Sequence, residues 1–133
     1  MGATTPIDRL EEVFKALSDR TRLRILALLG AGEVCVCHIH DTIGVPQPTA
    51  SRHLAYLRRT GLVDARREGV WMHYRLSASL DPVVRRLVHT AVDALKHVPA
   101  ATKDRKHYQK VFGRLHVVET HGGGSCCAPR GQT

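Results

Sequence analysis

The sequence predicts a mostly α-helical domain that carries one β-hairpin, and three observations lead to this fold class. Apolar residues recur at helical spacing in five segments, most of them ended by glycine or proline. The segment from 63 to 76 instead alternates apolar and polar residues, as β-strands do. The pentapeptide GVPQP leaves only a short turn between the third and fourth helices. This order of elements, four helices, a hairpin and a further helix, is the plan of a winged helix-turn-helix domain.

The five helices are expected at residues 7–17, 19–29, 34–43, 48–60 and 82–97. Ser18 is the expected N-cap of the second helix, with Asp19 in its first turn. Gly30, Gly44 and Gly61 mark helix ends, because glycine readily adopts the conformations found there. These signals place the recognition helix of the helix-turn-helix at 48–60.

The hairpin is expected over residues 63–76, with its turn at 67–69 and with Val70 in the apolar alternation of the second strand. Pro99 is expected to close the last of the five helices. Three regions follow from this reading: a winged helix-turn-helix DNA-binding and dimerisation domain at 1–98, a polar helical extension at 99–120, and a flexible glycine-rich tail with a cysteine pair at 121–133.

Charge and composition restrict the partners and the compartment. The chain carries a formal net charge of +8 and a pI near 9.9, which favours a polyanionic partner such as double-stranded DNA. No apolar run approaches the roughly 20 residues that cross a bilayer, and the first residues lack the pattern of a signal peptide. A cytoplasmic protein without membrane contact is therefore expected. Its four cysteines form two close pairs, which suggests metal-binding or redox-active thiolates rather than a disulfide framework.

The polar face of the expected fourth helix carries side chains that suit DNA recognition. The candidate DNA-binding residues on this helix and on the hairpin are Gln47, Thr49, Ser51, Arg52, His53, Tyr56, Arg58, Arg66 and Arg67. Glutamine and arginine can pair with adenine and guanine edges, while serine and threonine suit bases or phosphates. A solvated polar face would look similar, but the basic hairpin that follows favours a DNA-binding wing.

Four segments of the chain share a family pattern. FKALSDRTRLRILALL, EVCVC, PQPTASRHLAYLRRTGLV and REGVWMHYRL occur in an order that resembles the ArsR/SmtB family of winged-helix, metal-sensing repressors. The resemblance spans about residues 8–98. It implies a homodimer built from the first and fifth helices, a metal-free dimer that represses an operator, and release of the DNA when metal binds.

Apolar stripes on the first and fifth helices agree with a homodimer, because together they exceed what one small core needs. The stripe residues are Leu10, Val13 and Leu17 on the first helix and Leu87, Val88, Ala91 and Leu95 on the fifth. Two-fold symmetry then predicts DNA half-sites about 10 base pairs apart.

The stretch EVCVCHIHD resembles the ELCVCDLC signature of arsenic-responsive members of this family. Cys35 and Cys37 match its first two cysteines, whereas His40 stands where the signature has its third. Trivalent arsenic and antimony are soft ions that prefer three thiolates, so histidine is a poor substitute. The remaining cysteines, Cys126 and Cys127, follow three glycines whose chain can fold back and deliver the missing thiolate. The expected metal ligands are therefore these four cysteines, with As(III) or Sb(III) as the effector and no organic cofactor.

Helical geometry raises a difficulty for this site. Residues spaced i,i+2 lie about 200° apart around an α-helix, so Cys35 and Cys37 cannot easily share one ion while both are helical. Binding would need the first turn of the third helix to unwind, or to be irregular already. Through the turn at 44–48, that distortion would tilt the recognition helix and release the DNA.

Other interpretations remain open. His38 and His40 each lie three residues after a cysteine, so they could be supporting or alternative ligands in a repressor that responds to zinc or cadmium. A thiol redox switch is a further alternative, in which oxidation of the cysteines releases the DNA. An enzyme is not expected, because the chain lacks an acid placed to orient a Cys/His pair, a paired-carboxylate motif and a Gly-rich phosphate loop.

Overall fold

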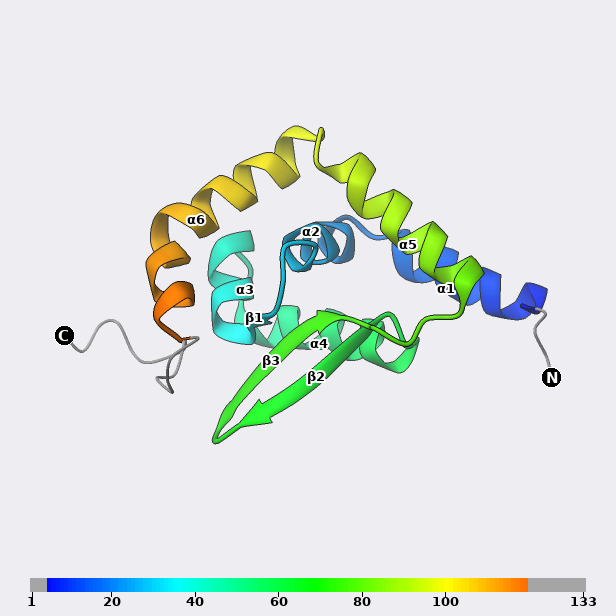
Figure 1. Cartoon of the computed structure of the whole chain (residues 1–133), viewed down its shortest axis with the longest axis horizontal. Coiled ribbons are helices and arrows are strands. Elements are labelled where there is room, and N and C mark those ends of the chain that lie inside the picture. Colours follow the sequence, from blue (N-terminus) through cyan, green and yellow to red (C-terminus); the bar gives the residue numbers. More distant parts are fainter. Residues whose placement is uncertain (1–4, 120–133) are drawn as a thin grey trace.

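The computed structural model describes residues 5–119, with side chains described up to residue 113. The helices are α1 (Ile7–Leu17), α2 (Arg20–Leu29), α3 (Val36–Ile43), α4 (Gln47–Arg59), α5 (Pro82–Leu95) and α6 (Pro99–Glu119), and the strands are β1 (Val34–Cys35), β2 (Val63–Glu68) and β3 (Trp71–Leu76). Helices α2, α3 and α4 lie at the centre, the β2–β3 hairpin projects beside α4, and α5 and α6 form an arch on the opposite side (Figure 1). The predicted fold class, a mostly helical winged helix-turn-helix, is confirmed.

Capping decides where the first two helices meet. α1 begins and ends as predicted. α2 begins one residue later than predicted, because Asp19 rather than Ser18 is its N-cap and accepts a hydrogen bond from the Arg22 N–H at 3.0 Å. Ser18 instead closes α1, since its N–H donates to the Lys15 carbonyl. Both residue types are good N-caps, so the sequence alone does not distinguish them.

The connection between the last two described helices is longer than predicted. Asp81 caps α5 by accepting hydrogen bonds from two backbone N–H groups. The helix ends at Leu95, two residues before the predicted end. The prediction that Pro99 closes α5 is wrong: Pro99 is the first residue of α6, because proline fits the first turn of a helix.

The third helix is shorter than predicted because its first two expected residues form a strand. Val34 lies opposite Tyr74 of β3, and Cys35 lies opposite His73. Helix α3 therefore starts at Val36, with Cys35 as its N-cap in an extended conformation (φ −74°, ψ 146°). The edge of β3 supplies hydrogen-bond partners for an extended segment, and the β-branched Val34 favours that conformation.

The wing belongs to a three-stranded antiparallel sheet in the order β1-β3-β2. Glu68 pairs with Trp71, so a two-residue turn of Gly69 and Val70 joins β2 to β3, later than the predicted turn at 67–69. Gly69 has φ +65°, the positive value that such a short hairpin turn needs at its first position. Val70 is 82% exposed in this turn, so the prediction that it continues the strand alternation is wrong.

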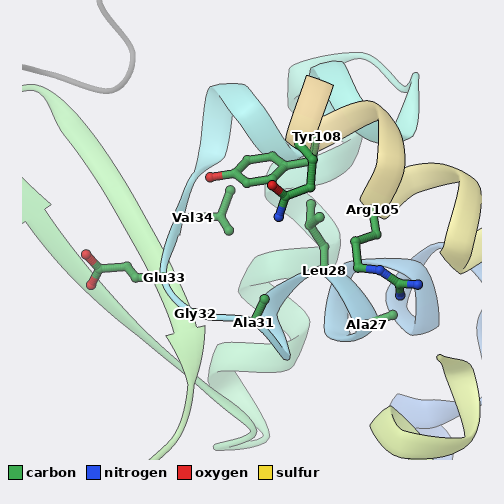
Figure 2. A pocket seen from close by; sticks show the side chains of 9 residues that line it. Ala27, Leu28, Ala31, Gly32, Glu33, Val34, Arg105 and Tyr108 are labelled. Atoms are coloured by element: carbon green, nitrogen blue, oxygen red, sulfur yellow. The ribbon is translucent and has the colours of Figure 1, made fainter. Parts of the chain in front are cut away.

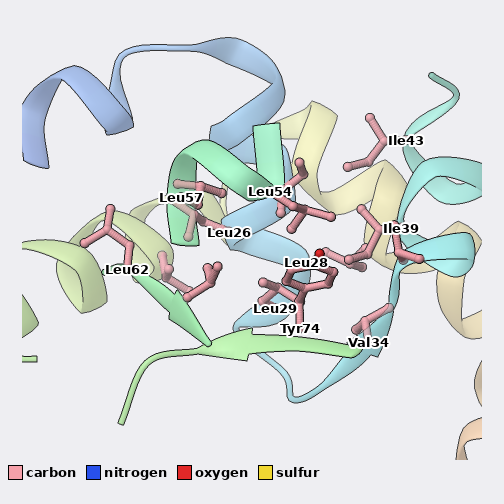
Figure 3. Packing of buried hydrophobic residues seen from close by; sticks show 14 of the residues in the cluster. Leu26, Leu28, Leu29, Val34, Ile39, Ile43, Leu54, Leu57, Leu62 and Tyr74 are labelled. Carbon is pink, nitrogen blue, oxygen red and sulfur yellow. The ribbon is translucent and has the colours of Figure 1, made fainter. Parts of the chain in front are cut away.

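The core lies between the central helices and the sheet. Leu26, Leu54 and Leu57 are fully buried there (Figure 3). Helix α6 closes the core from another side, with Phe112 fully buried and Tyr108 only 8% exposed. Burying a side chain as large as phenylalanine contributes about 1.5–3 kcal/mol. Helix α6 therefore shares one core with α2 and α3, although its sequence is mostly polar.

A buried ion pair also fastens α6. The Nε and Nη2 atoms of Arg24 donate to the Asp104 carboxylate at 2.8 and 2.7 Å, and Nη2 donates to the Ile43 carbonyl at 3.1 Å. Asp104 is 3% exposed. Its hydrogen bonds raise the pKa of Arg24. One guanidinium thus connects α2, α6 and the last residue of α3.

Candidate nucleic-acid interface and thiol site

Helix α4 presents a polar face and is joined to α3 by a short turn. Gly44 ends α3 with a left-handed φ of +81°, and Pro46 is the N-cap of α4. The buried residues of α4 are Ala50, Leu54 and Leu57. Of the candidate DNA-binding residues on α4, Gln47, Arg52 and Arg58 are exposed, and Thr49 and Ser51 are partly exposed. Helix α4 and the hairpin lie on the same side of the molecule, where one duplex could contact both (Figure 1).

Two candidate DNA-binding side chains of α4 are engaged by α2. The Nη1 atom of Arg22 lies 3.3 Å from His53 Nδ1, and the Arg22 guanidinium lies 4.0 Å from the centre of the Tyr56 ring. His53 Nδ1 also lies 3.7 Å from the Asp19 carboxylate. His53 and Tyr56 therefore hold the recognition helix against the start of α2.

The far end of α4 is tied to α1. Arg9 donates from Nη1 to the Thr60 carbonyl at 2.6 Å, directly after the last residue of α4. A cation at this position interacts favourably with the C-terminal end of the helix. The polar face of α4 is thus presented by a helix that is held by α2 at its middle and by α1 at its C-terminal end.

The two candidate arginines of the wing have different surroundings. Arg66 donates two hydrogen bonds to Glu33, at 2.6 and 3.1 Å, and a third to Glu68 at 3.4 Å. Arg67 is exposed and lies on the other face of β2, because successive strand side chains alternate. Arg67 shares that face with Val63, which is buried against the helical core. Arg67 is therefore on the face of the sheet that turns towards α4.

The two cysteines of the candidate thiol site meet at the start of α3. Their Sγ atoms lie 3.4 Å apart. This is possible because Cys35 lies in the strand that precedes the helix, so the separation of about 200° between two helical residues does not apply. Of the two predicted routes to this site, an unwound first turn or a segment that is already irregular, the structure shows the second: Cys35 is extended, and it faces Cys37 with α3 intact.

The other two predicted ligands, Cys126 and Cys127, lie outside the described residues. Within the part of the chain that the structure describes, no three His, Cys, Asp or Glu side chains are grouped closely enough to hold a metal ion. The described part thus brings together two sulfur atoms, one fewer than the three that a trivalent soft ion prefers.

The two histidines after the cysteines have other contacts. His38 is 2% exposed and stacks on Phe112, with ring centroids 3.8 Å apart. His40 Nδ1 lies 3.2 Å from the Val45 carbonyl oxygen, at the end of α3. As the described side chains stand, neither histidine completes a metal-binding group with Cys35 and Cys37.

A small cavity of about 90 Å³ lies beside this segment, between α2, the connection into β1, and α6. Leu28, Val34 and Tyr108 form much of its wall (Figure 2). Glu33 borders the cavity, but Figure 2 shows its carboxylate turned towards the hairpin, where Arg66 lies. Helix α6 therefore passes close to the segment that leads into Cys35.

Sequence analysis did not single out Arg22, Arg24 or Asp104, although these residues position α4 and α6. Their partners lie 31 and 80 residues away along the chain, so no local pattern reveals them. Arginine and aspartate in polar helical segments look like ordinary solvent-facing residues until the fold pairs them.

The fold and the site define a winged helix-turn-helix DNA-binding regulator. A family model described as "Bacterial regulatory protein, arsR family" matches residues 19–65. The chain is 43% identical over 81 residues to the arsenical resistance operon repressor of Escherichia coli, which covers 60% of this chain and 69% of that protein. It is 41% identical over 92 residues to a cadmium resistance transcriptional regulatory protein CadC homolog of Staphylococcus aureus, covering 68% and 73%.

A solved structure supports the same assignment. The homodimeric winged helix-turn-helix DNA-binding domain Mb0332 of Mycobacterium bovis matches with a TM-score of 0.57 and 36% identity, covering 74% of this chain and 94% of that domain. The chain belongs to the ArsR family of bacterial transcription regulators. It is accordingly a DNA-binding transcription factor and not an enzyme. Among the described residues, no helix is both long and apolar enough to cross a membrane.

Proposed function

We propose that the chain is a metalloid-responsive repressor. As a homodimer in the cytoplasm, it binds operator DNA and is released when As(III) or Sb(III) binds to Cys35, Cys37 and one or both of Cys126 and Cys127. The observation that carries this proposal is the 3.4 Å separation of the Cys35 and Cys37 sulfurs at the start of α3, the helix that leads directly into α4. The relationship to an arsenical resistance repressor supports the choice of effector.

The sulfur geometry suits a single ion. With metal–sulfur bonds of about 2.3 Å, two sulfurs at this separation subtend an angle of about 95° at the ion. Such an angle leaves room for a third thiolate in a pyramidal arrangement. Soft thiolate donors select soft ions over the harder ions that carboxylates and water prefer.

The third thiolate is proposed to come from the chain beyond α6. Phe112 of α6 stacks on His38, which is the residue after Cys37, so α6 runs beside the thiol site. Cys126 is seven residues beyond Glu119, the last residue of α6, and seven residues can span up to about 25 Å. That reach allows Cys126 and Cys127 to bind within their own chain or in the partner of a dimer.

The proposed dimer uses α1 and α5. Ile7 and Phe14 of α1 are 77% and 55% exposed, and the homodimeric relative supports such an assembly. The part-buried apolar residues that continue this surface are Leu10, Leu17, Leu87, Ala91 and Leu95. Two members of the predicted stripes, Val13 and Val88, are fully buried within one chain and are not available to a partner. They serve the monomer core instead.

The proposed DNA contacts come from α4 and the wing. Gln47, Thr49, Ser51, Arg52 and Arg58 would face the major groove, and Arg67 would contact the phosphate backbone. His53 and Tyr56 are proposed to act by holding α4 in place through Arg22.

Effector release tests this function. An operator selected by the protein from a random duplex pool would be titrated by fluorescence anisotropy with and without antimonite or arsenite. We expect the effector to weaken binding about a hundredfold, which corresponds to about 2.7 kcal/mol of coupling. Cys35→Ser and Cys37→Ser should bind the operator normally but resist release, and Cys126→Ser/Cys127→Ser should need more effector. If Cys35→Ser and Cys37→Ser release the operator at the same effector concentration as wild type, the proposal is contradicted.

Two alternatives are decided by the same titration. A Cd(II)- or Zn(II)-responsive repressor is favoured by the relationship to a cadmium resistance regulator, and it predicts release by those ions at lower concentrations than Sb(III). A thiol redox switch is favoured by the contact between the Cys35 and Cys37 sulfurs. It predicts release by peroxide in metal-free buffer and recovery with dithiothreitol.

A further inference from the structure

Strand β2 of the wing contains an arginine whose guanidinium already forms hydrogen bonds with two carboxylates. Arg66 donates from Nη2 to one Glu33 oxygen at 2.6 Å and from Nε to the other at 3.1 Å. Its third nitrogen, Nη1, lies 3.4 Å from Glu68. The pKa of Glu33 is lowered mainly by the hydrogen bonds from Arg66. The fork of the guanidinium that would bind a phosphate in two places is thus filled by a carboxylate.

Strand pairing brings Glu33 and Arg66 together from distant parts of the chain. Arg66 lies opposite His73 on one side of β3, and Cys35 lies opposite His73 on the other. Cys35, His73 and Arg66 therefore form one row across the sheet. Glu33 is two residues before Cys35 and extends along the same face, where Figure 2 shows its carboxylate directed at the hairpin.

The charges around Arg66 oppose a DNA contact. One guanidinium (+1) is shared by two carboxylates (−2), so the group has a net charge of −1. A phosphate that approaches Arg66 must displace Glu33 and meets the repulsion of both acids. Arg67 lies on the opposite face of β2, on the side of α4. Among the interactions of the described residues, no carboxylate is paired with Arg67, so a phosphate need not displace one.

We propose that Glu33 withholds Arg66 from DNA phosphates and so limits the affinity of this regulator for DNA, leaving Arg67 as the DNA-binding arginine of the wing. This inference rests on the proposed DNA-binding function but not on the identity of the effector. Glu33 is thus a positioning residue for DNA binding: it acts by keeping a neighbouring cation engaged.

A double-mutant cycle tests the proposal without knowledge of the operator. Wild type, Glu33→Gln, Arg66→Gln and the double variant would be titrated with a fluorescein-labelled mixed-sequence duplex at several salt concentrations. Glu33→Gln should bind about fivefold more tightly, and its slope of log K against log salt should steepen by about 0.9 for each protomer, since one more phosphate is neutralised. Arg66→Gln alone should leave the salt slope unchanged, because Arg66 neutralises no phosphate in wild type, and the double variant should return affinity and slope to wild type.

Asp64→Asn is the matched control, because Asp64 lies on the same face of β2 and its change of charge is the same. It pairs with Arg75 at 3.8 Å rather than with Arg66. This variant should leave the salt slope unchanged, and thermal melting should verify that all variants remain folded. A salt slope that steepens equally in Asp64→Asn would overturn the proposal.

Three further results have distinct meanings. A shallower salt slope in Arg66→Gln alone would overturn the proposal, because Arg66 would then neutralise a phosphate with Glu33 present. An equal gain from Glu33→Gln with and without Arg66 would also overturn it, since the gain would be long-range repulsion. If the wild-type protein binds no duplex at all, the proposed function itself fails, and this inference fails with it.

Discussion

The apolar side chains at the two ends of the molecule differ in how far they are covered by the rest of the chain. At the α6 end, Phe112 and Tyr108 are buried, and Arg24 and Asp104 satisfy each other within one chain. At the α1 end, Phe14 remains more than half exposed. One end is therefore covered by helix α6 of the same chain, while the other leaves apolar surface exposed, which we have proposed to bind a second copy. The difference indicates that α6 contributes to the stability of the protomer and lies on its thiol side, whereas α1 and α5 carry the proposed assembly surface.

The largest loss of stability is expected when the largest fully buried side chain of α6 is removed. Phe112→Ala is expected to cost about 3–5 kcal/mol of unfolding free energy, because it leaves a cavity against His38. Urea denaturation followed by circular dichroism measures the loss. Val111→Ala is the control, since Val111 is 39% exposed and its truncation should cost less than about 0.5 kcal/mol. Equal losses in the two variants would mean that α6 is not part of the core.

The ion pair of α6 should respond unequally to the loss of either partner. Arg24→Met leaves the Asp104 carboxylate buried and unpaired, and we expect a loss of about 3 kcal/mol. Asp104→Asn leaves a neutral amide beside Arg24, whose side chain is 26% exposed, and should cost about 1 kcal/mol. Lys96→Met, which removes an exposed pair with Asp93, serves as a control with little effect. Urea denaturation that gave the same cost for Arg24→Met and Asp104→Asn would argue against a desolvated carboxylate.

The α5 side depends on a close approach of two helices. A Cβ added at Gly30 would lie 2.6 Å from Val92 Cγ1, so Gly30→Ala should destabilise the fold by about 1–3 kcal/mol. Adding Val92→Ala should recover part of the loss, because the clashing methyl is removed. Gly113→Ala is the matched control: its nearest contact is ordinary at 3.4 Å, and a helical alanine should add stability. Differential scanning calorimetry would compare the three variants, and an unchanged melting temperature for Gly30→Ala would contradict the expected clash.

The smallest expected effect concerns the exposed apolar surface of α1. Phe14→Ser should leave the helical content unchanged but weaken dimerisation about tenfold, as for an aromatic residue at the centre of an interface. Sedimentation velocity over a range of protein concentrations measures the shift. Glu11→Gln, also exposed on α1, should leave the association constant at its wild-type value. A dimer that tolerates Phe14→Ser would place the assembly surface elsewhere.

Helical periodicity predicted most elements correctly, because each helix buries a stripe against the core. β1 could not be predicted in the same way, since a two-residue strand exists only because the edge of β3 lies beside it. For the same reason the sequence left open how Cys35 and Cys37 could meet in one site: the helical spacing of the two residues is interrupted by a strand–helix junction. Local sequence also gave no sign that Asp104 is buried, because its partner Arg24 lies in a different helix.

The sequence predicts which residues belong to the candidate site, but it does not predict which other residues they contact. The cysteine pair and the polar face of α4 are visible as patterns in the sequence. That Arg66 is engaged by Glu33 and that His53 faces Arg22 depends on packing between distant segments. The proposed ligands Cys126 and Cys127 remain predictions, because they lie outside the described residues.

The pairing of Arg24 with Asp104 has a consequence for how quickly the chain folds. Small helical domains fold fast because most of their contacts join residues near each other in sequence. Here the partners are 80 residues apart, so α2 becomes fully buried only after a long segment has closed and α6 has docked. We therefore expect a refolding rate below that of helical bundles of similar size. During synthesis, the core would be completed only when α6 has emerged from the ribosome.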